Sequence, residues 1–266
     1  MSSDVLSSLS RDVILYLNSI SDPEKVRLSK RWDKDDRYDT YGLNAADFTA
    51  LYETFNPRFK ALIPEQRMEL ADIWATTGNR TLIHLGVHLL RLSAREGSLE
   101  PAHFDYLDAF TEGFQGWGNV DTFCSSVMQP LLDKYPDKVM SLLRGWNASL
   151  NPMKRRTSIV TFTRKTAESG RYVDLILELC GNLIWDREDL VREGVGWALK
   201  NAMHADRPRI VERALHQMDP SYLANALQIT SVAINRCMES ASSFFSCTPR
   251  TLGRTPPEAF SPQSLS

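Results

Sequence analysis

The chain has 266 residues, of which 42% are hydrophobic and 24% charged, with a net charge of -2 and a pI of about 6.2. This length fits one large domain or two small ones, and the apolar content is enough for a sizeable core. A charge this close to neutral does not by itself indicate a nucleic-acid-binding protein. The sequence contains no apolar run long enough to span a membrane and no N-terminal pattern of a signal peptide. We therefore expect an intracellular protein without membrane contact.

Nearly every segment predicts a helix, because apolar residues recur at a spacing close to 3.6. Asp22-Pro23-Glu24 is a helix start, Asn44, Asn79 and Asn151 are expected N-caps, and Asn56-Pro57 is an expected break. The helices expected in chain order cover residues 4–19, 23–32, 44–55, 64–76, 80–95, 101–115, 120–135, 136–148, 152–167, 171–184, 187–203, 207–217 and 220–239.

The breaks are spaced so that consecutive helices pair into antiparallel hairpins with short loops. This pattern predicts an all-α fold, a curved HEAT-like α-solenoid of degenerate repeats, with a compact helical bundle as the alternative. The β-branched run Ser158–Thr163 favours a strand locally, but a lone strand in a helical chain has no partner. We expect one domain over residues 1–239 and a disordered tail rich in Ser, Pro and Thr over residues 240–266.

The junction Gly116–Asp121 places a large aromatic residue, Trp117, four positions before a carboxylate, Asp121. If the following helix begins at Trp117, the two side chains share a face. If it begins after Asn119, that residue is the N-cap and Asp121 lies in the first turn. In both cases Asp121 is near a helix N-terminus, where an acid commonly has only a capping role.

The charge is uneven along the chain. One stretch, from residue 144 to residue 171, has seven cations and a single acid, Glu168; the cations are Arg144, Lys154, Arg155, Arg156, Arg164, Lys165 and Arg171. Such a stretch is typical of an anion-binding surface, and it is equally typical of a solvated helix face.

Other familiar kinds of site are not indicated. His84 and His88 have the i, i+4 spacing of two metal ligands, but Leu85 stands where the H-E-x-x-H pattern requires Glu, and no third ligand is apparent. The four cysteines form no C-x-x-C pair, and Cys124 is interpreted as a buried thiol. The sequence has neither a glycine-rich phosphate loop nor a G-x-S-x-G motif. Gly194 and Gly196 weaken a helix, which indicates either tight helix packing or close approach of a ligand.

Three short groups, taken in order, resemble the AlkD family of DNA alkylation-repair glycosylases. They are Trp117-x-x-x-Asp121, then Arg156 before Thr157-Ser158-Ile159, then Gly196-Trp197-x-Leu199-Lys200. The likeness also includes Asp22-Pro23-Glu24-Lys25 and Tyr41-Gly42-Leu43, so it covers roughly residues 20–215.

The resemblance implies a glycosylase that excises cationic N3- or N7-alkylated purines from duplex DNA. It implies catalytic roles for Asp121, Trp117 and Trp197, and DNA-backbone contacts by Arg156, together with Arg155, Lys154, Lys200 and Arg164. No metal or cofactor is expected, and the protein is expected to act as a monomer. Two alternatives stay open, a relative that binds DNA without excising bases and a helical-repeat adaptor for a protein partner.

Overall fold

The computed structural model describes residues 2–33 and 37–217, and within these ranges the fold is all-α. No strand occurs among the described residues, although an isolated β-bridge pairs Asp39 with Asn79. The elements are, in chain order, α1 (Ser2–Ile20), α2 (Pro23–Asp33), α3 (Ala45–Ala61), α4 (Pro64–Ala75), α5 (Arg80–Arg95), η1 (Pro101–His103), α6 (Phe104–Thr111), α7 (Gly116–Phe123), η2 (Cys124–Met128), α8 (Gln129–Lys134), α9 (Pro136–Asn147), α10 (Pro152–Val160), α11 (Lys165–Glu168), α12 (Val173–Leu183) and α13 (Asp189–Gln217).

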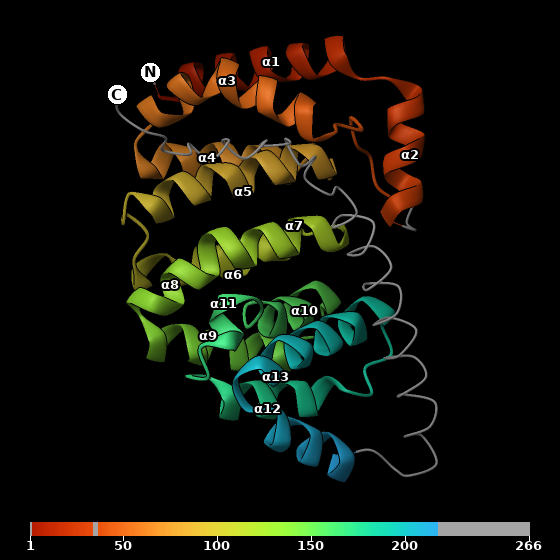
Figure 1. Cartoon of the computed structure of the whole chain (residues 1–266). Helices are drawn as coiled ribbons and strands as arrows, with labels where there is room; N and C mark the ends of the chain where they lie inside the picture. Colours follow the sequence, from red (N-terminus) through yellow and green to blue (C-terminus); the bar gives the residue numbers. More distant parts are fainter. Residues whose placement is uncertain (1, 34–36, 218–266) are drawn as a thin grey trace, which may run out of the picture. The chain divides into compact units, whose positions relative to one another are not determined.

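Most of the helices stack broadly in the order of the chain, with α2 at the side of the stack, as Figure 1 shows. Within this stack α5 contacts α7, α7 contacts α10, and α10 contacts α13. Three helices of this series also pack on the helix before them, in the pairs α4 with α5, α9 with α10 and α12 with α13. The series α5, α7, α10 and α13 therefore brings together segments that are far apart in the sequence. The concave surface expected of a curved solenoid stays a prediction.

The expected N-caps are confirmed by hydrogen bonds. The side-chain oxygen of Asn44 accepts from the backbone N–H groups of Ala46 and Asp47, and Asn79 and Asn151 cap α5 and α10 in the same way. These caps satisfy backbone donors that have no partner within the first helical turn. The caps thus fix where α3, α5 and α10 begin, and with them the faces that these helices bury.

One expected break does not occur, because α3 continues through Pro57 to Ala61. Proline inside a helix removes a hydrogen bond and is unfavourable by about 3 kcal/mol. Here Leu51, Phe55 and Phe59 form one buried stripe that spans the proline, which itself faces solvent. Burial of Phe59 on the far side of Pro57 accounts for the continuation, since a large aromatic side chain contributes a comparable stabilisation when buried.

One other expected helix is divided, whereas the expected absence of a strand and an expected break are both confirmed. The segment expected as a single helix over residues 152–167 is divided into α10 and α11 by a turn at residues 161–164. The Ser158–Thr163 run forms no strand, and its first three residues belong to α10. The expected break near residue 205 is present as a kink inside α13, where Asp206 has non-helical angles (φ -149°, ψ 75°). The expected helix 220–239 and tail 240–266 lie outside the described residues.

Candidate functional site

Helix α7 begins at Gly116, which settles the two alternatives for Asp121. Gly116 has a φ of 71°, a conformation that favours glycine, and the helical turn that follows includes Trp117. Asn119 is not an N-cap, since it is buried inside the helix and its side-chain amide faces the backbone oxygen of Arg80 at 3.4 Å. Trp117 and Asp121 therefore share one face of α7, and the indole is 38% exposed.

Asp121 is largely buried and forms an ion pair with Arg156 of α10. Its side chain is 16% exposed, and the Nη2 atom of Arg156 lies 3.0 Å from Oδ1 and 3.3 Å from Oδ2. Burial is the largest influence on this carboxyl group and raises its pKa, whereas the positive charges of Arg156 and Arg164 act to lower it. Glu193 of α13 raises the pKa further by charge repulsion. The site thus holds a carboxylate in a poorly solvated place beside a fixed positive charge.

Arg156 lies beneath this surface and contacts groups of the protein itself. Its side chain is 6% exposed, its Nε atom is 3.3 Å from Oδ1 of Asp121, and Nη1 donates to the backbone oxygen of Leu190 at the start of α13. The resemblance predicts that Arg156 contacts a DNA phosphate. In the structure this guanidinium joins α7, α10 and α13 at the carboxylate, and a DNA contact by Arg156 stays a prediction.

The two cations before Arg156 are likewise buried in ion pairs. Lys154 bonds to Asp108 at 2.8 Å and to Glu112. Arg155 makes a bidentate pair with Asp186 at 2.6 and 3.0 Å. Burial and paired acids explain why this part of the basic stretch is neither a solvated helix face nor an open anion-binding surface. A DNA contact by Lys154 or Arg155 stays a prediction.

A second group of predicted residues lies on α13 and on the turn that faces it. The guanidinium of Arg164 sits over the indole of Trp197, with Cζ 5.6 Å from the ring centroid. Arg164 is exposed, whereas Trp197 and Lys200 are half-buried. The effect of Arg164 on the pKa of Asp121 shows that this group lies within electrostatic reach of the carboxylate. The structure therefore links Asp121, Arg156, Arg164 and Trp197, and places Trp117 on the same face of α7 as Asp121.

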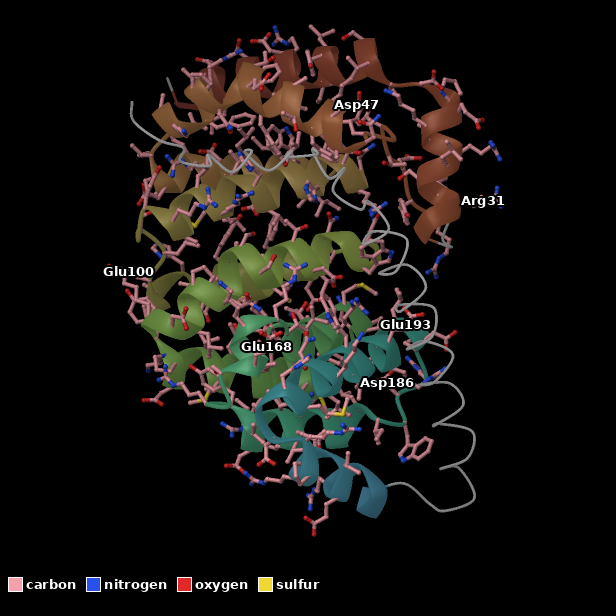
Figure 2. All side chains as sticks on the ribbon, in the orientation of Figure 1. Arg31, Asp47, Glu100, Glu168, Asp186 and Glu193 are labelled. Atoms are coloured by element: carbon pink, nitrogen blue, oxygen red, sulfur yellow. The ribbon has the colours of Figure 1, made fainter. Side chains whose placement is uncertain are left out.

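Two neighbours of the site have no signal in the sequence. Arg80, at the start of α5, covers Gly118, since a Cβ added to Gly118 would lie 2.7 Å from Nη2 of Arg80. Burial lowers the pKa of Arg80 to about 10. Glu193 lies one helical turn before Trp197 on α13, and Figure 2 labels it there together with Asp186 in the preceding loop. Neither residue is among the site residues predicted from the sequence, and the packing of α5 on α7 and of α13 on α10 identifies them.

The helix that carries Asp121 changes its winding immediately after it. Residues Cys124–Met128 form a π-helical turn, η2, between α7 and α8. Such turns insert one extra residue into a helix and are frequent at functional sites. Where the winding changes, the backbone oxygen of Asp121 accepts from the hydroxyl of Ser125 at 2.9 Å and from the backbone N–H of Cys124. No residue pattern in the sequence predicts this turn.

The histidines and Cys124 have structural surroundings. Nε2 of His88 lies 2.7 Å from Oδ1 of Asn56 and the imidazole stacks on Tyr52, while burial lowers the pKa values of His84 and His88 to about 4. No group of three possible metal ligands occurs in the part of the chain that the structure describes. Cys124 is fully buried, and burial raises the pKa of its thiol. The interpretation of Cys124 as a core thiol rather than a nucleophile is confirmed by this burial.

Comparisons with known proteins agree with this description. A protein-family model described as DNA alkylation repair enzyme matches residues 13–234. Among solved structures, that of a predicted DNA alkylation repair enzyme from Enterococcus faecalis is similar, with a TM-score of 0.62 and 14% sequence identity over 75% of this chain and 92% of that one. This likeness concerns the fold. No curated protein matches the chain. Within the described ranges, no helix is both long and apolar enough to cross a membrane.

Proposed function

Because the chain belongs to the family of DNA alkylation repair enzymes, we propose that it is a DNA glycosylase that releases N3- and N7-alkylated purines from duplex DNA. The observation that carries this proposal is the ion pair between Asp121 and Arg156. It fixes a carboxylate on the same face as an exposed indole, Trp117, and within electrostatic reach of Arg164. Such a carboxylate suits a reaction in which positive charge develops on the substrate.

The chemistry of the lesion explains why one carboxylate is enough. A purine alkylated at N3 or N7 carries a positive charge, so it departs as a neutral base with the electron pair of its N-glycosidic bond. Positive charge then develops on the deoxyribose, and Asp121 stabilises that charge. Water adds to C1′ and gives its proton to Asp121. Because the lesion is already activated, the reaction needs no metal or cofactor.

The two tryptophans contribute apolar faces rather than acid–base groups. The π face of an indole attracts a cation, and it packs well against the carbon atoms of a sugar. We propose that Trp117 and Trp197 contact the deoxyribose of the lesion from α7 and α13. The exposed cation Arg164 and the half-buried Lys200 then contact phosphates, which set the position of the DNA without reading its sequence. One molecule of the protein is expected to act on one duplex.

Base release from duplex DNA that contains 7-methylguanine tests this function. We expect the wild-type protein to release the free base and to leave abasic sites that break on heating. The released base is measured by chromatography, and the abasic sites are measured by strand scission. Binding to the duplex without release would instead support a DNA-binding relative without catalysis. Absence of both binding and release would contradict the proposal and would favour a protein-interaction role.

Affinity for duplex DNA should fall as the salt concentration rises. A protein that neutralises phosphates releases counterions, so the logarithm of affinity falls linearly with the logarithm of salt concentration, by about 0.9 for each phosphate contact. Replacing Arg164 by alanine should weaken binding to all sequences alike and reduce this slope by about 1. Fluorescence anisotropy over a range of salt concentrations measures both effects.

Arg144 offers a matched control in the same basic stretch, because it is already paired with Glu178 at 2.7 Å. Arg144→Ala should leave the salt slope unchanged. An affinity that does not depend on salt, or equal slopes for the wild-type protein and the Arg164 variant, would contradict phosphate binding at Arg164.

A further inference from the structure

Two glycines interrupt the part of α13 that faces the candidate site, and the structure explains one of them by packing. A Cβ added to Gly194 would lie 3.1 Å from Cδ1 of Ile159 and 3.3 Å from Cγ2 of Val160. These distances are shorter than ordinary van der Waals contacts, and Gly194 is buried. Gly194 is therefore required for the close approach of α13 to α10, so tight helix packing accounts for this glycine.

The packing explanation does not apply to Gly196. A Cβ added there would meet no atom within 4 Å, and the residue is half-buried. Glycine inside a helix is less favourable than alanine. Since nothing within the described chain occupies the space beside Gly196, the fold gains no contact in return. The missing side chain leaves the α13 backbone at Gly196 partly exposed beside Trp197.

A residue with an unfavourable backbone conformation contacts the same part of α13. Arg164 has a φ of 55° and is the single non-glycine residue with positive φ in the part of the chain that is described. Its backbone N–H donates to Oδ1 of Asn201 at 2.7 Å, and its guanidinium lies over Trp197. Trp197 and Asn201 are four residues apart on α13, so one face of the helix positions both ends of Arg164. Strained residues of this kind concentrate at binding and catalytic sites.

We propose that the α13 backbone at Gly196 is a contact site for the sugar–phosphate backbone of a DNA strand. This proposal rests on the proposed function and adds a site to it. A phosphodiester is indicated because Arg164 and Lys200 have no acidic partner in an ion pair among the described residues, and Lys200 lies one turn after Gly196 on the same face. The acid Glu193 lies one turn before Trp197, so the phosphate binds on the Lys200 side.

If a DNA strand binds here, the absence of a side chain at Gly196 allows the strand to approach the helix closely. A methyl group at this position would separate the strand from Trp197 and from both cations. It should not disturb the fold of the described residues, because, apart from its chain neighbours and its own helix backbone, none of them has an atom within 4 Å of that methyl position. A substitution at Gly196 should therefore lower DNA affinity without lowering stability, whereas a substitution at a glycine needed for packing should lower stability.

The experiment compares alanine at three helical glycines. Gly196→Ala should raise the melting temperature by about 2–4 °C through helix propensity and weaken binding to an unmodified duplex by about tenfold. Gly145→Ala on α9 is the control, since Gly145 is also helical and a Cβ there meets nothing within 4 Å. It should raise the melting temperature similarly and leave the affinity unchanged. Gly194→Ala should lower the melting temperature, because its methyl group meets Ile159 and Val160.

Glutamine at positions 196 and 145 extends the comparison with a longer side chain. Gly196→Gln should weaken binding more than Gly196→Ala, and Gly145→Gln should again have no effect on affinity. Wild-type affinity in both Gly196 variants would overturn this inference and leave the proposed function intact. If the wild-type protein itself fails to bind duplex DNA, the proposed function fails, and this inference fails with it.

Discussion

Replacing Asp121 by asparagine is expected to slow the release of 7-methylguanine by about 10²–10³-fold, while DNA affinity changes little. The carboxylate faces little positive sugar charge in the ground state and much more in the transition state, so its loss acts on the rate rather than on binding. Removal of one such electrostatic contact typically has an effect of this size. Single-turnover base release measures the chemical step without interference from product release.

The pH dependence provides a second readout of the same variant. Burial raises the pKa of Asp121, and catalysis needs the ionised form. The wild-type rate should therefore fall as the pH is lowered through this raised pKa, at a higher pH than an exposed aspartate would give. The Asp121→Asn variant has no group to protonate there, so its low residual rate should lack this decline. A single-turnover pH profile of both proteins makes the comparison.

Asp186 provides a matched control for the loss of a buried ion pair. Its side chain is 7% exposed and it pairs with Arg155, the neighbour of Arg156 on α10, at 2.6 Å. Asp186→Asn should therefore affect stability in a similar way but leave the excision rate unchanged. Equal excision by the wild-type protein and Asp121→Asn would show that Asp121 is only a structural acid near a helix start. Equal rate losses in the two asparagine variants would indicate a general effect of destabilisation.

The sequence predicts the helices well, because their ends are determined by local chemistry. Asn44, Asn79 and Asn151 act as N-caps within two or three residues of their own position, so a short window contains the whole interaction. The apolar stripe of α5, with Leu82, Leu85, Leu89 and Leu92, is buried as its spacing predicts. Such features need no knowledge of distant segments.

The failures of the sequence prediction occur where distant contacts override local preference. Pro57 predicts a break, but burial of Phe59 keeps α3 intact beyond it. Arg164 adopts a positive φ without being a glycine, held by Asn201 from a helix 37 residues away. The turn that divides α10 from α11 contains neither glycine nor proline, so the sequence contains no common signal for it. Tertiary contacts, by burial at Phe59 and by a hydrogen bond at Arg164, override local propensity at these places.

At the candidate site, too, the local spacing of residues is predictable from the sequence, whereas contacts between distant residues are not. The spacing of Trp117 and Asp121 predicts their shared face, because four residues make about one helical turn. The composition of the basic stretch does not predict which of its cations are paired with acids inside the protein. The acids lie far away in the sequence: Asp121 is 35 residues from Arg156, Asp108 is 46 from Lys154, and Asp186 is 31 from Arg155. A charge run in a sequence shows which cations are present. Only the packing of α6, α7 and the loop before α13 against α10 shows which of them are already paired.

Replacing Arg156 by methionine is expected to slow base release by about 10²-fold with little change in DNA affinity. Arg156 fixes the carboxylate of Asp121 through Nη2 and Nε, and a misplaced catalytic group typically lowers the rate by this factor. Because its positive charge also lowers the pKa of Asp121, the pH at which the rate declines should move upward in this variant. Single-turnover pH profiles and anisotropy titrations measure the two effects.

Two further variants separate the charge of Arg156 from its geometry and from stability. Arg156→Lys keeps the charge without the bidentate pair, so it should retain more of the wild-type pH profile than Arg156→Met while excising slowly. Arg155→Met removes the partner of Asp186 and should destabilise the fold by a similar amount, about 3–5 kcal/mol, without changing the pH profile. If Arg156→Met instead lowers affinity and reduces the salt slope by about 1, the side chain contacts a phosphate, as the resemblance implies. In that event the inward position of Arg156 would have to change when DNA binds, and its pair with Asp121 would not be what positions the catalytic carboxylate.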